Sequence, residues 1–445
     1  MKQRGSVAER LLPLMRFFFG AEMPIEVKAW DGSRLGPKQG AARLVIRSPE
    51  ALRRLLTAPN EVGLGRAYVA GELEIEGDIY AALNIRDTME NERQTDDLGM
   101  GVKGWLHALK SAADLRLVGR PPAPPPEEVG LGGPRHSLRR DARAVAHHYD
   151  VSNDFYRLVL GPTMTYSCAY FAHEGMGLDD AQVAKYDLIC RKLGLRPGMR
   201  LLDIGCGWGG MVLHAARHYG VEAVGITISQ RQHDLASRRV AAAGLGDRTQ
   251  IRLQDYRQLR NESYEAISSI GMFEHVGRAR LAEYFDLVVR LLEPGGRFLN
   301  HGITRRAGKS TPHKKTFATS FVFPDGELHE VGSVVSTMQQ QRQLEVRDVE
   351  SLREHYAKTL RFWVDNLESN WSQAVELSGP GRARIWRLYM AASALNFEAG
   401  RTYIHQVLAV RPDGRGDSGM PLTRGNWLKA HAPATGVLPG TKELV

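Results

Sequence analysis

A glycine-rich turn after an apolar run is the segment whose residue types best suit ligand chemistry. The run Leu201-Leu-Asp-Ile-Gly-Cys-Gly-Trp-Gly-Gly210 indicates a buried strand that turns sharply into a helix. Glycines in such a turn let the backbone approach a ligand, and the helix N-terminus that follows accepts the ligand's polar groups. Gly205, Gly207 and Gly210 also satisfy G-x-G-x-x-G, so a dinucleotide site is a competing hypothesis.

The residues around this turn favour a different cofactor. Asp203 stands two residues before the first glycine, where its carboxylate can bind an ammonium group. The next predicted strand runs into 225–232, which supplies hydroxyl and amide groups and lacks the acid that NAD sites use for a ribose hydroxyl. Asp203-x-Gly-x-Gly-x-Gly209 resembles the first motif of class I S-adenosylmethionine methyltransferases. A dinucleotide enzyme and a purely structural glycine turn remain the alternatives.

The elements that must position these residues alternate between strand and helix in the second part of the chain. Strands are predicted at 199–205, 222–228, 249–254, 264–270 and 296–302, and helices at 180–193, 209–218, 230–243 and 280–292. This alternation predicts an α/β fold with a mostly parallel sheet and helices on both faces. Further predicted elements are antiparallel edge strands at 344–348 and 403–410 and long helices at 349–367 and 381–400.

A proline-rich segment divides the chain. Residues 121–134 hold six prolines and three glycines, which disfavour a continuous helix and favour an extended linker. We therefore predict an N-terminal accessory domain at 1–120 and a catalytic domain at 135–445. The N-terminal part mixes short strands at 24–30 and 42–46, paired through an Asp31-Gly32 turn, with a capped helix at 48–56, which predicts a small α+β module.

Composition limits the class of protein. The 445 residues are 43% hydrophobic and 24% charged, which is typical of globular domains. Three cysteines at 168, 190 and 206 fit neither a disulfide framework nor a zinc site, so a reducing compartment and no metal are expected. No apolar stretch is long enough to span a bilayer. The net charge of +9 favours an anionic partner such as a membrane surface, a nucleic acid or a phosphorylated ligand.

Several further motifs occur in a recognisable order. These segments are His147–Tyr156, Met164–Phe171, Gly271–Gly277, His301–Ile303 and His355–Trp363. Together with the glycine turn they resemble the cyclopropane-fatty-acyl-phospholipid synthase family, which includes the mycolic acid cyclopropane synthases, over about residues 140–411. The resemblance implies a Rossmann-like class I methyltransferase fold. The N-terminal part resembles the accessory domain of the longer, phospholipid-acting members.

The resemblance also implies two sets of site residues. The S-adenosylmethionine-binding residues would be Tyr166, Ser167, Asp203, Gly205, Gly207, Gly209, Thr227, Gln232, Tyr256 and Arg257. The catalytic residues, around a bound bicarbonate, would be Cys168, Glu274, His301, Ile303 and Tyr356. Structural roles remain as alternatives, because a cysteine, a histidine or a tyrosine of this kind is also common in an ordinary core.

The implied chemistry starts from an alkene, which has no acidic proton for a base to remove. The enzyme must align the alkene with the sulfonium methyl group and exclude water. Methyl transfer leaves a carbocation, which the aromatic faces of Tyr170, Trp208 and Phe273 can stabilise. Bicarbonate would then take a proton so that a cyclopropane ring closes. The same cation can instead shift a hydride and lose a proton, giving a methylene-branched chain that a partner reductase would reduce.

The predicted partners are unsaturated phospholipid acyl chains at the inner face of the cytoplasmic membrane. Surface contact is expected through Leu11–Phe19 and through the arginines at 135, 139, 140 and 143, and tunnel walls through Phe317–Phe323. A homodimer is an open alternative to a monomer. A nucleic-acid methyltransferase and a non-catalytic lipid-binding protein are competing classes, but no base-flipping motif or RNA module is evident, so no nucleic-acid partner is expected.

Overall fold

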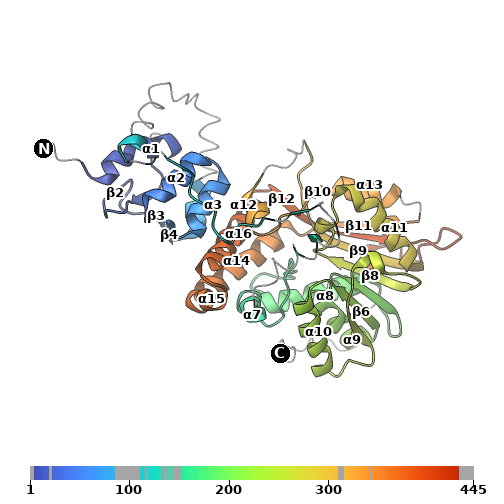
Figure 1. Cartoon of the computed structure of the whole chain (residues 1–445). Coiled ribbons are helices and arrows are strands. Elements are labelled where there is room, and N and C mark those ends of the chain that lie inside the picture. The colour runs from blue at the N-terminus through green and yellow to red at the C-terminus, as the bar shows by residue number, and fades with distance from the viewer. Residues whose placement is uncertain are drawn as a thin grey trace. The chain divides into compact units, whose positions relative to one another are not determined.

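The computed structural model describes residues 5–19, 23–85, 111–115, 117, 119–130, 132–133, 137, 140–141, 143, 152–308, 315–340 and 343–429. Contacts group the chain into two compact units. Unit 1 consists of Met1–Gly130, Pro312–Val322 and Ser378–Leu395, and unit 2 of Leu131–Thr311, Phe323–Leu377 and Asn396–Val445. Figure 1 labels the helices and strands of both units.

Unit 1 is built around a four-stranded sheet in the order β2-β1-β3-β4. Its strands are β1 (Glu26–Lys28), β2 (Arg34–Leu35), β3 (Ala42–Ile46) and β4 (Leu73–Gly77). Its helices include α1 (Val7–Phe19), α2 (Pro49–Thr57), α3 (Glu61–Val69), α12 (Phe317–Phe321) and most of α16 (Pro380–Glu398). Leu11, Val27 and Leu52 are buried in one core between sheet and helices. The small α+β composition predicted for the N-terminal part is confirmed.

The predicted pairing of 24–30 with 42–46 as a hairpin is wrong. The chain turns at Gly32, and the strand that returns beside β1 is the two-residue β2, with Val27 opposite Leu35. Strand β3 then lies on the other side of β1 and runs parallel to it. The Asp31-Gly32 signal located the turn but carried no information about the more distant partner strand. Ser48 also makes no side-chain cap bond, whereas Asn60 caps α3 by accepting from two backbone amides.

Part of the apolar segment expected to contact a membrane, Leu11–Phe19, belongs to the core of unit 1 instead. Leu11, Leu14 and Met15 are buried in the core of unit 1, because α1 turns this face toward the sheet. The side chains of Phe17–Phe19, like Arg135 and Arg139, lie outside the described residues. Arg140 forms a two-pronged ion pair with Asp325 at 2.7 and 2.8 Å and is not a free basic group. No helix in the described part of the chain has the length and apolar character to span a bilayer.

Two late segments of the chain complete unit 1. In α16, Arg384 pairs with Glu74 of β4 at 2.9 Å, and Arg387 donates to the Tyr68 hydroxyl of α3 at 3.0 Å. In α12, Phe317 packs so closely against Gly65 of α3 that a Cβ there would lie 2.3 Å from its ring. The sequence analysis assigned both segments to the domain at 135–445, whereas contacts group them with the N-terminal unit. The linker at 121–134 stays a prediction.

Unit 2 contains the large sheet, in the order β11-β12-β9-β8-β5-β6-β7, with a short β10 paired to β9. The strands are β5 (Arg200–Ile204), β6 (Glu222–Thr227), β7 (Thr249–Leu253), β8 (Tyr264–Ile270), β9 (Leu292–Arg305), β10 (His329–Glu330), β11 (Glu345–Ser351) and β12 (Thr402–Val410). Strands β7, β6, β5, β8 and β9 are mutually parallel. Strands β12 and β11 add antiparallel at one edge. The predicted mostly parallel sheet with an antiparallel edge is therefore confirmed.

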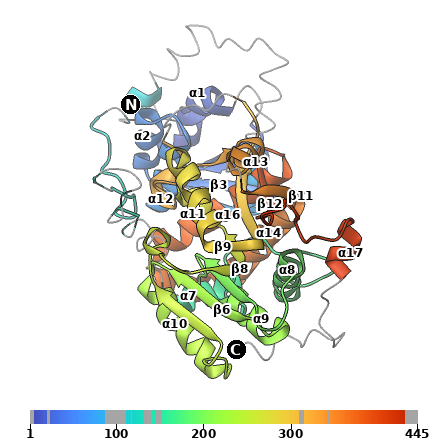
Figure 2. The same cartoon turned by 90° about the vertical axis from the view of Figure 1, so that its right-hand side faces the viewer.

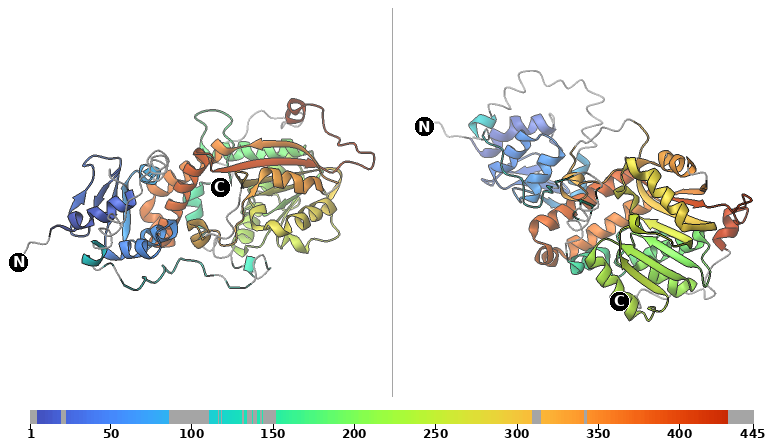
Figure 3. Two further views of the ribbon diagram at one scale, coloured as in Figure 1. Left: turned by 90° about the horizontal axis from the view of Figure 1, so that it is seen from above. Right: turned by 45° about the vertical axis from the view of Figure 1, so that its right-hand side comes forward.

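Both faces of this sheet are covered by helices (Figures 2 and 3). The helices of unit 2 are α7 (Asn153–Leu160), α8 (Leu178–Leu193), α9 (Gly210–Tyr219), α10 (Gln230–Ala242), α11 (Leu281–Leu291), α13 (Val331–Gln340), α14 (Arg353–Ser369), α15 (Trp371–Ser378) and α17 (Arg424–Lys429). In β5, Leu201 joins the core under α8 and α9, while its neighbour Leu202 joins the core under α11. Successive strand residues point to opposite faces, so two adjacent leucines of one strand supply two cores at once.

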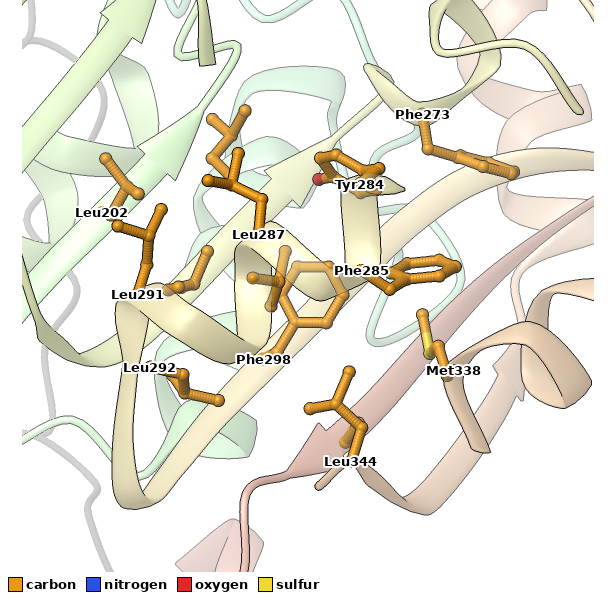
Figure 4. Close-up of a cluster of buried hydrophobic side chains, with 14 of the residues drawn as sticks. Leu202, Phe273, Tyr284, Phe285, Leu287, Leu291, Leu292, Phe298, Met338 and Leu344 are labelled. Carbon is orange, nitrogen blue, oxygen red and sulfur yellow. The ribbon is translucent and has the colours of Figure 1, made fainter. Parts of the chain in front are cut away.

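Helix α11 shows how the sequence produces one of these cores. Leu281, Tyr284, Phe285, Val288 and Leu291 recur at helical spacing and all are buried. This stripe packs on Phe298 of β9 and on Met338 of α13, as Figure 4 shows. The predicted helix at 280–292 is confirmed to within one residue at each end.

Two boundaries differ from the prediction. The helix expected at 349–367 begins at Arg353, because Val349, Glu350 and Ser351 extend β11 and pair with β12. Strand β9 is longer than the expected 296–302 and continues to Arg305, where it gains β10 as a partner. In both places the strand depends on a partner distant in the sequence.

Truncating the centre of the α11 core should destabilise unit 2. Phe285 is fully buried beside Phe298, with ring centroids 6.2 Å apart. We expect Phe285→Ala to lower the free energy of unfolding by about 3–5 kcal/mol, because it removes an aromatic ring and leaves a cavity. Urea unfolding followed by near-UV circular dichroism measures the change. Asp286→Ala, on the exposed side of the same helix, is the matched control and should shift stability by less than about 0.5 kcal/mol. Equal effects of the two variants would contradict the assignment.

Candidate active site

The glycine turn between β5 and α9 forms an open cradle at the carboxyl edge of the sheet. Gly205, Gly207 and Gly209 all have positive φ, at 80°, 55° and 83°, a conformation that other L-residues rarely adopt. The amides of Gly205 and Cys206 donate to Ile226 O of β6 at 3.0 and 2.9 Å, which fixes the turn to the neighbouring strand. A Cβ added at Gly207 would meet nothing within 4 Å, so space is open on that side of the backbone.

Asp203, at the end of β5, is buried and paired. Its Oδ1 accepts a hydrogen bond from Ser268 Oγ of β8 at 2.6 Å. Burial raises the pKa of this carboxyl to about 6, while the Ser268 hydrogen bond and the nearby Lys185 ammonium act in the opposite direction. The carboxylate therefore lies beneath the glycine turn with a hydroxyl partner. Its predicted contact with the cofactor's ammonium group stays a prediction.

Lys185 is a functional candidate that the sequence analysis missed. It lies on α8 without solvent exposure, and its Nζ donates to Ser167 Oγ at 3.0 Å and sits 4.1 Å from the centroid of the Tyr186 ring. Burial lowers its pKa to about 7. A signal was present in the sequence, because Lys185 occupies the same helix face as the buried Ala181 and Ile189, four residues to either side.

The segment that carries Tyr166, Ser167 and Cys168 is held from two sides. Gln182 of α8 donates to Ser167 O at 2.9 Å, and Thr359 Oγ1 of α14 accepts from Ala169 N at 3.1 Å. The Tyr166 ring lies 5.3 Å from that of Trp363 on α14. Helices α8 and α14 thus fix the backbone of the predicted cofactor pair, Tyr166 and Ser167.

The other predicted cofactor residues follow the ends of β6 and β7. Thr227 Oγ1 donates to Gln232 Oε1 at 2.8 Å, so these two buried side chains are paired with each other. Arg257 makes ion pairs with Asp255 at 2.7 Å and with Asp141 at 3.0 Å, and these carboxylates raise its pKa. Burial raises the pKa of Tyr256 to about 12. All these groups follow the carboxyl ends of parallel strands, where ligands bind in open α/β sheets.

Glu274 and His301 each have a buried polar atom that lacks a hydrogen-bond partner in the described part of the chain. Glu274, in the turn after β8, accepts from Ile303 N through Oε1 at 2.6 Å, while its Oε2 is buried without a partner in the described structure. His301 of β9 is fully buried, and its Nε2 is also without a partner there. Burial raises the pKa of Glu274 to about 7 and lowers that of His301 well below its usual range.

Cys168 and Tyr356 meet at the first turn of α14. The Cys168 thiol donates to Leu352 O at 3.7 Å, the carbonyl that also accepts from Tyr356 N at 3.1 Å. Burial raises the pKa of Cys168, so it is a neutral thiol and not a nucleophilic thiolate. Tyr356 is buried, with ring centroids 6.0 Å from Trp363 and 4.8 Å from Phe397.

The chemical character of these two unpaired atoms is compatible with a small anion that both donates and accepts hydrogen bonds. Bicarbonate has a hydroxyl group that suits the unpaired Glu274 Oε2 and oxygen acceptors that suit a donor at His301 Nε2. Within the described ranges no group of three His, Cys, Asp or Glu residues is arranged to hold a metal ion. His147 and His148, which the sequence analysis placed in a motif, lie outside the described residues.

The sheet order and the glycine turn together define a class I S-adenosylmethionine-dependent methyltransferase fold. The crystal structure of mycolic acid cyclopropane synthase CmaA1 complexed with SAH and CTAB matches with a TM-score of 0.57 and 36% sequence identity, covering 60% of this chain and 97% of that chain. A family model described as mycolic acid cyclopropane synthetase matches residues 136–407. The chain belongs to this family of S-adenosylmethionine-dependent lipid methyltransferases, which confirms the resemblance found in the sequence.

Full-length relatives carry two kinds of name. A Mycobacterium tuberculosis protein named probable fatty acid methyltransferase is 42% identical over 410 residues, which cover 90% of this chain and 94% of that protein. The cyclopropane-fatty-acyl-phospholipid synthase of Escherichia coli K12 is 32% identical over 373 residues, which cover 83% of this chain and 88% of that protein. The similarity therefore extends through the N-terminal part as well as the methyltransferase fold.

A side chain at Gly207 should abolish cofactor binding. A β-branched residue strains a backbone with φ of 55° and fills the open side of the turn. We expect Gly207→Val to show no S-adenosylmethionine binding by calorimetry. Gly244→Val is the matched control, because Gly244 has a similar φ of 66° and an equally open surrounding after α10. If Gly207→Val binds the cofactor as tightly as Gly244→Val does, the turn is not the cofactor cradle.

The buried carboxyl of Glu274 should cost stability at high pH. Its pKa is about 7 in the folded chain against an ordinary 4.5, so the unfolded state releases this proton first as pH rises. Stability therefore falls from about pH 4.5 to 7 and stays lower above pH 7. In bicarbonate-free buffer at about pH 8.5, the free energy of unfolding of Glu274→Gln should be roughly 3 kcal/mol higher than that of the wild type. At about pH 4 the variant should show no such gain in stability. Glu283→Gln, at an exposed side chain, should show no gain at either pH. A pH-independent effect of Glu274→Gln would exclude this titration.

Proposed function

We propose that this protein transfers the methyl group of S-adenosylmethionine to the double bond of an unsaturated phospholipid acyl chain and forms a cyclopropane fatty acid. The observation that carries the proposal is the pair of unpaired polar atoms Glu274 Oε2, in the turn after β8, and His301 Nε2, on the adjacent strand β9, both buried. A dry site with an unused acceptor and an unused imidazole nitrogen suits a small anionic base. Bound bicarbonate would supply that base and take the proton lost from the new methyl group.

An aromatic series supports a cationic intermediate. Ring contacts run from Trp208 in the glycine turn to Tyr156 at 4.9 Å, then to Tyr166 at 6.2 Å and on to Trp363 at 5.3 Å. Trp363 in turn contacts Tyr356, one of the proposed bicarbonate residues. The series therefore connects the methyl-donor side with the proposed base. Aromatic faces attract a cation most strongly where water is excluded, so these rings suit the carbocation left by methyl transfer.

Two of the aromatic residues named from the sequence have other neighbours. Tyr170 stacks on His355 with centroids 5.1 Å apart, away from the ring series. Phe273 packs against Gly302, where an added Cβ would lie 1.9 Å from its ring. In the proposed mechanism Phe273 therefore positions the Glu274 turn against β9, and Trp208 is the named residue that lies in the series.

The protein's own groups would orient the base and hold the substrate, and none of them would act as the base. Glu274 is fixed through Oε1 by Ile303 N, so its free Oε2 serves to orient the anion. His301 and Tyr356 would hold the remaining oxygens, and Cys168 would keep the start of α14 in place. We further propose that the acyl chain reaches the site from a membrane surface on the cytoplasmic side.

A second outcome of the same methyl transfer is a methylene-branched acyl chain. The 42% identical relative is named a probable fatty acid methyltransferase, a name that does not specify a cyclopropane product, so this outcome stays a second candidate. A hydride shift in the carbocation followed by proton loss would leave an olefin, and a separate reductase would then give a methyl branch. The same site residues serve both outcomes, so the product itself must be identified.

Product analysis tests the proposed function. Purified protein with isotopically labelled S-adenosylmethionine and unsaturated phospholipid vesicles should give acyl chains that gain one CH₂ and resist ozonolysis, since a cyclopropane holds no olefin. A gain of CH₂ with an ozonolysis-sensitive chain would identify the methylene-branched product instead. Gly207→Val provides the inactive control. Label that enters RNA and leaves phospholipid unlabelled would refute lipid methylation altogether.

Bicarbonate dependence tests the proposed base. Enzyme freed of bicarbonate by degassing should lose most of its turnover and recover it when bicarbonate is restored, while S-adenosylmethionine affinity stays unchanged. The reason is that the base acts after cofactor binding. Full-rate turnover in the absence of bicarbonate would contradict this part of the proposal, and the product analysis would remain valid.

A further inference from the structure

Gln406 lies directly beside His301 in the middle of the sheet. It belongs to β12, which runs antiparallel to β9, and its Cα is the register partner of that of His301. Both residues have no solvent exposure, and Gln406 Nε2 lies 3.1 Å from His301 Nδ1. Directly opposed residues on neighbouring strands present their side chains on one face, which explains why this bond forms.

The orientation of the Gln406 amide favours one of the two neutral forms of His301. The structure turns the NH₂ group of Gln406 toward Nδ1 of His301. An amide NH₂ group donates and does not accept, so in this amide orientation Nδ1 is the acceptor and bears no hydrogen. Burial and the positive charges of Lys185 and Lys192 lower the pKa of His301, which keeps its ring neutral at neutral pH. A neutral imidazole has one N–H, and it must then be at Nε2. Nε2 is the buried atom that has no partner in the described structure.

Burial of the Gln406 side chain at this position lowers the stability of the fold. Its Oε1 is buried without a partner in the described part of the chain, so the amide is only half satisfied. An apolar side chain of the same size would avoid that cost. Incompletely satisfied buried groups are expected where function requires them.

We propose that Gln406 is a positioning residue that holds His301 in the Nε2–H form, so that the site offers an N–H donor to an anion with acceptor oxygens. The proposal rests on the proposed function, in which that anion is bicarbonate. Without the Gln406 amide, the hydrogen can move to Nδ1 and leave a lone pair at Nε2. A lone pair repels anion oxygens, so the bond acts on catalysis through His301 without touching the cofactor.

Two substitutions at Gln406 separate the tautomer from simple packing. Gln406→Met keeps the volume but removes the donor, and Gln406→Glu supplies an acceptor that draws the hydrogen to Nδ1. We expect Gln406→Glu to lower kcat by roughly 10- to 100-fold and to raise the bicarbonate concentration needed for half-maximal turnover. The KM for S-adenosylmethionine should change by less than about 2-fold, because Gln406 contacts His301 and not the cofactor cradle. Gln406→Met should have an intermediate effect.

Nitrogen NMR of histidine-labelled protein reads the tautomer directly. The His301 signal is identified by its loss in His301→Gln. The wild type should show Nε2–H, and Gln406→Glu should show Nδ1–H. Thr304→Val is the matched control, since Thr304 bonds His405 Nδ1 at 2.8 Å on the same two strands. It should leave both the His301 tautomer and kcat unchanged.

Each result decides for or against the proposal. Nδ1–H in the wild type, or an unchanged tautomer in Gln406→Glu, would overturn it. A loss of kcat that is the same in Gln406→Met and Gln406→Glu, with Nε2–H kept in both, would show a purely structural role and also overturn it. If wild-type turnover proves independent of bicarbonate, the proposed base fails, yet the tautomer measurement on ligand-free enzyme still tests Gln406.

Discussion

The site depends on the hydrogen bond from Ile303 N to Glu274 Oε1, which joins the turn after β8 to the adjacent strand β9. This bond can form because Gly302 has no side chain: a Cβ there would lie 1.9 Å from the Phe273 ring. Phe273 therefore packs directly on β9. Glu274, the next residue, is thereby close enough to accept a hydrogen bond from the backbone of that strand. One glycine thus permits the close approach that holds the buried Glu274 carboxylate at the backbone of β9.

Burial is the common cause of the electrostatic behaviour of this region. Asp203, Lys185, Glu274 and His301 lie on neighbouring elements, and desolvation is the largest cause of the pKa shift in each. Every shift favours the neutral form, because little solvent reaches these groups to stabilise their charges. A dry site of this kind strengthens the attraction between aromatic rings and a cation and protects a carbocation from water.

The parts predicted well from the sequence are those set by local pattern. The strand predicted at 264–270 is found there as β8, a short segment whose residues are mostly buried, with parallel strands on both sides. The glycine turn was equally evident, since positive φ restricts the residue type. The errors arise where distant pairing decides. The partner of β1, the start of α14 and the role of Gln406 all depend on contacts that no local pattern encodes. Gln406 and His301 are 105 positions apart in the chain.

The geometry of Glu274 bears on why a separate base would be useful. A carboxylate that accepts a backbone hydrogen bond through one oxygen is held at the strand and cannot move toward different carbons of a flexible acyl chain. Its pKa of about 7 leaves it partly protonated at neutral pH, so it can either accept or donate one hydrogen bond. Such a group is well suited to fix the orientation of a small ion that has both a hydroxyl and acceptor oxygens. In the proposed mechanism the protein thus keeps its own carboxyl stationary and leaves proton removal to a bound anion. Glu274, held between the turn after β8 and strand β9, would orient that anion together with the Gln406–His301 pair on β12 and β9.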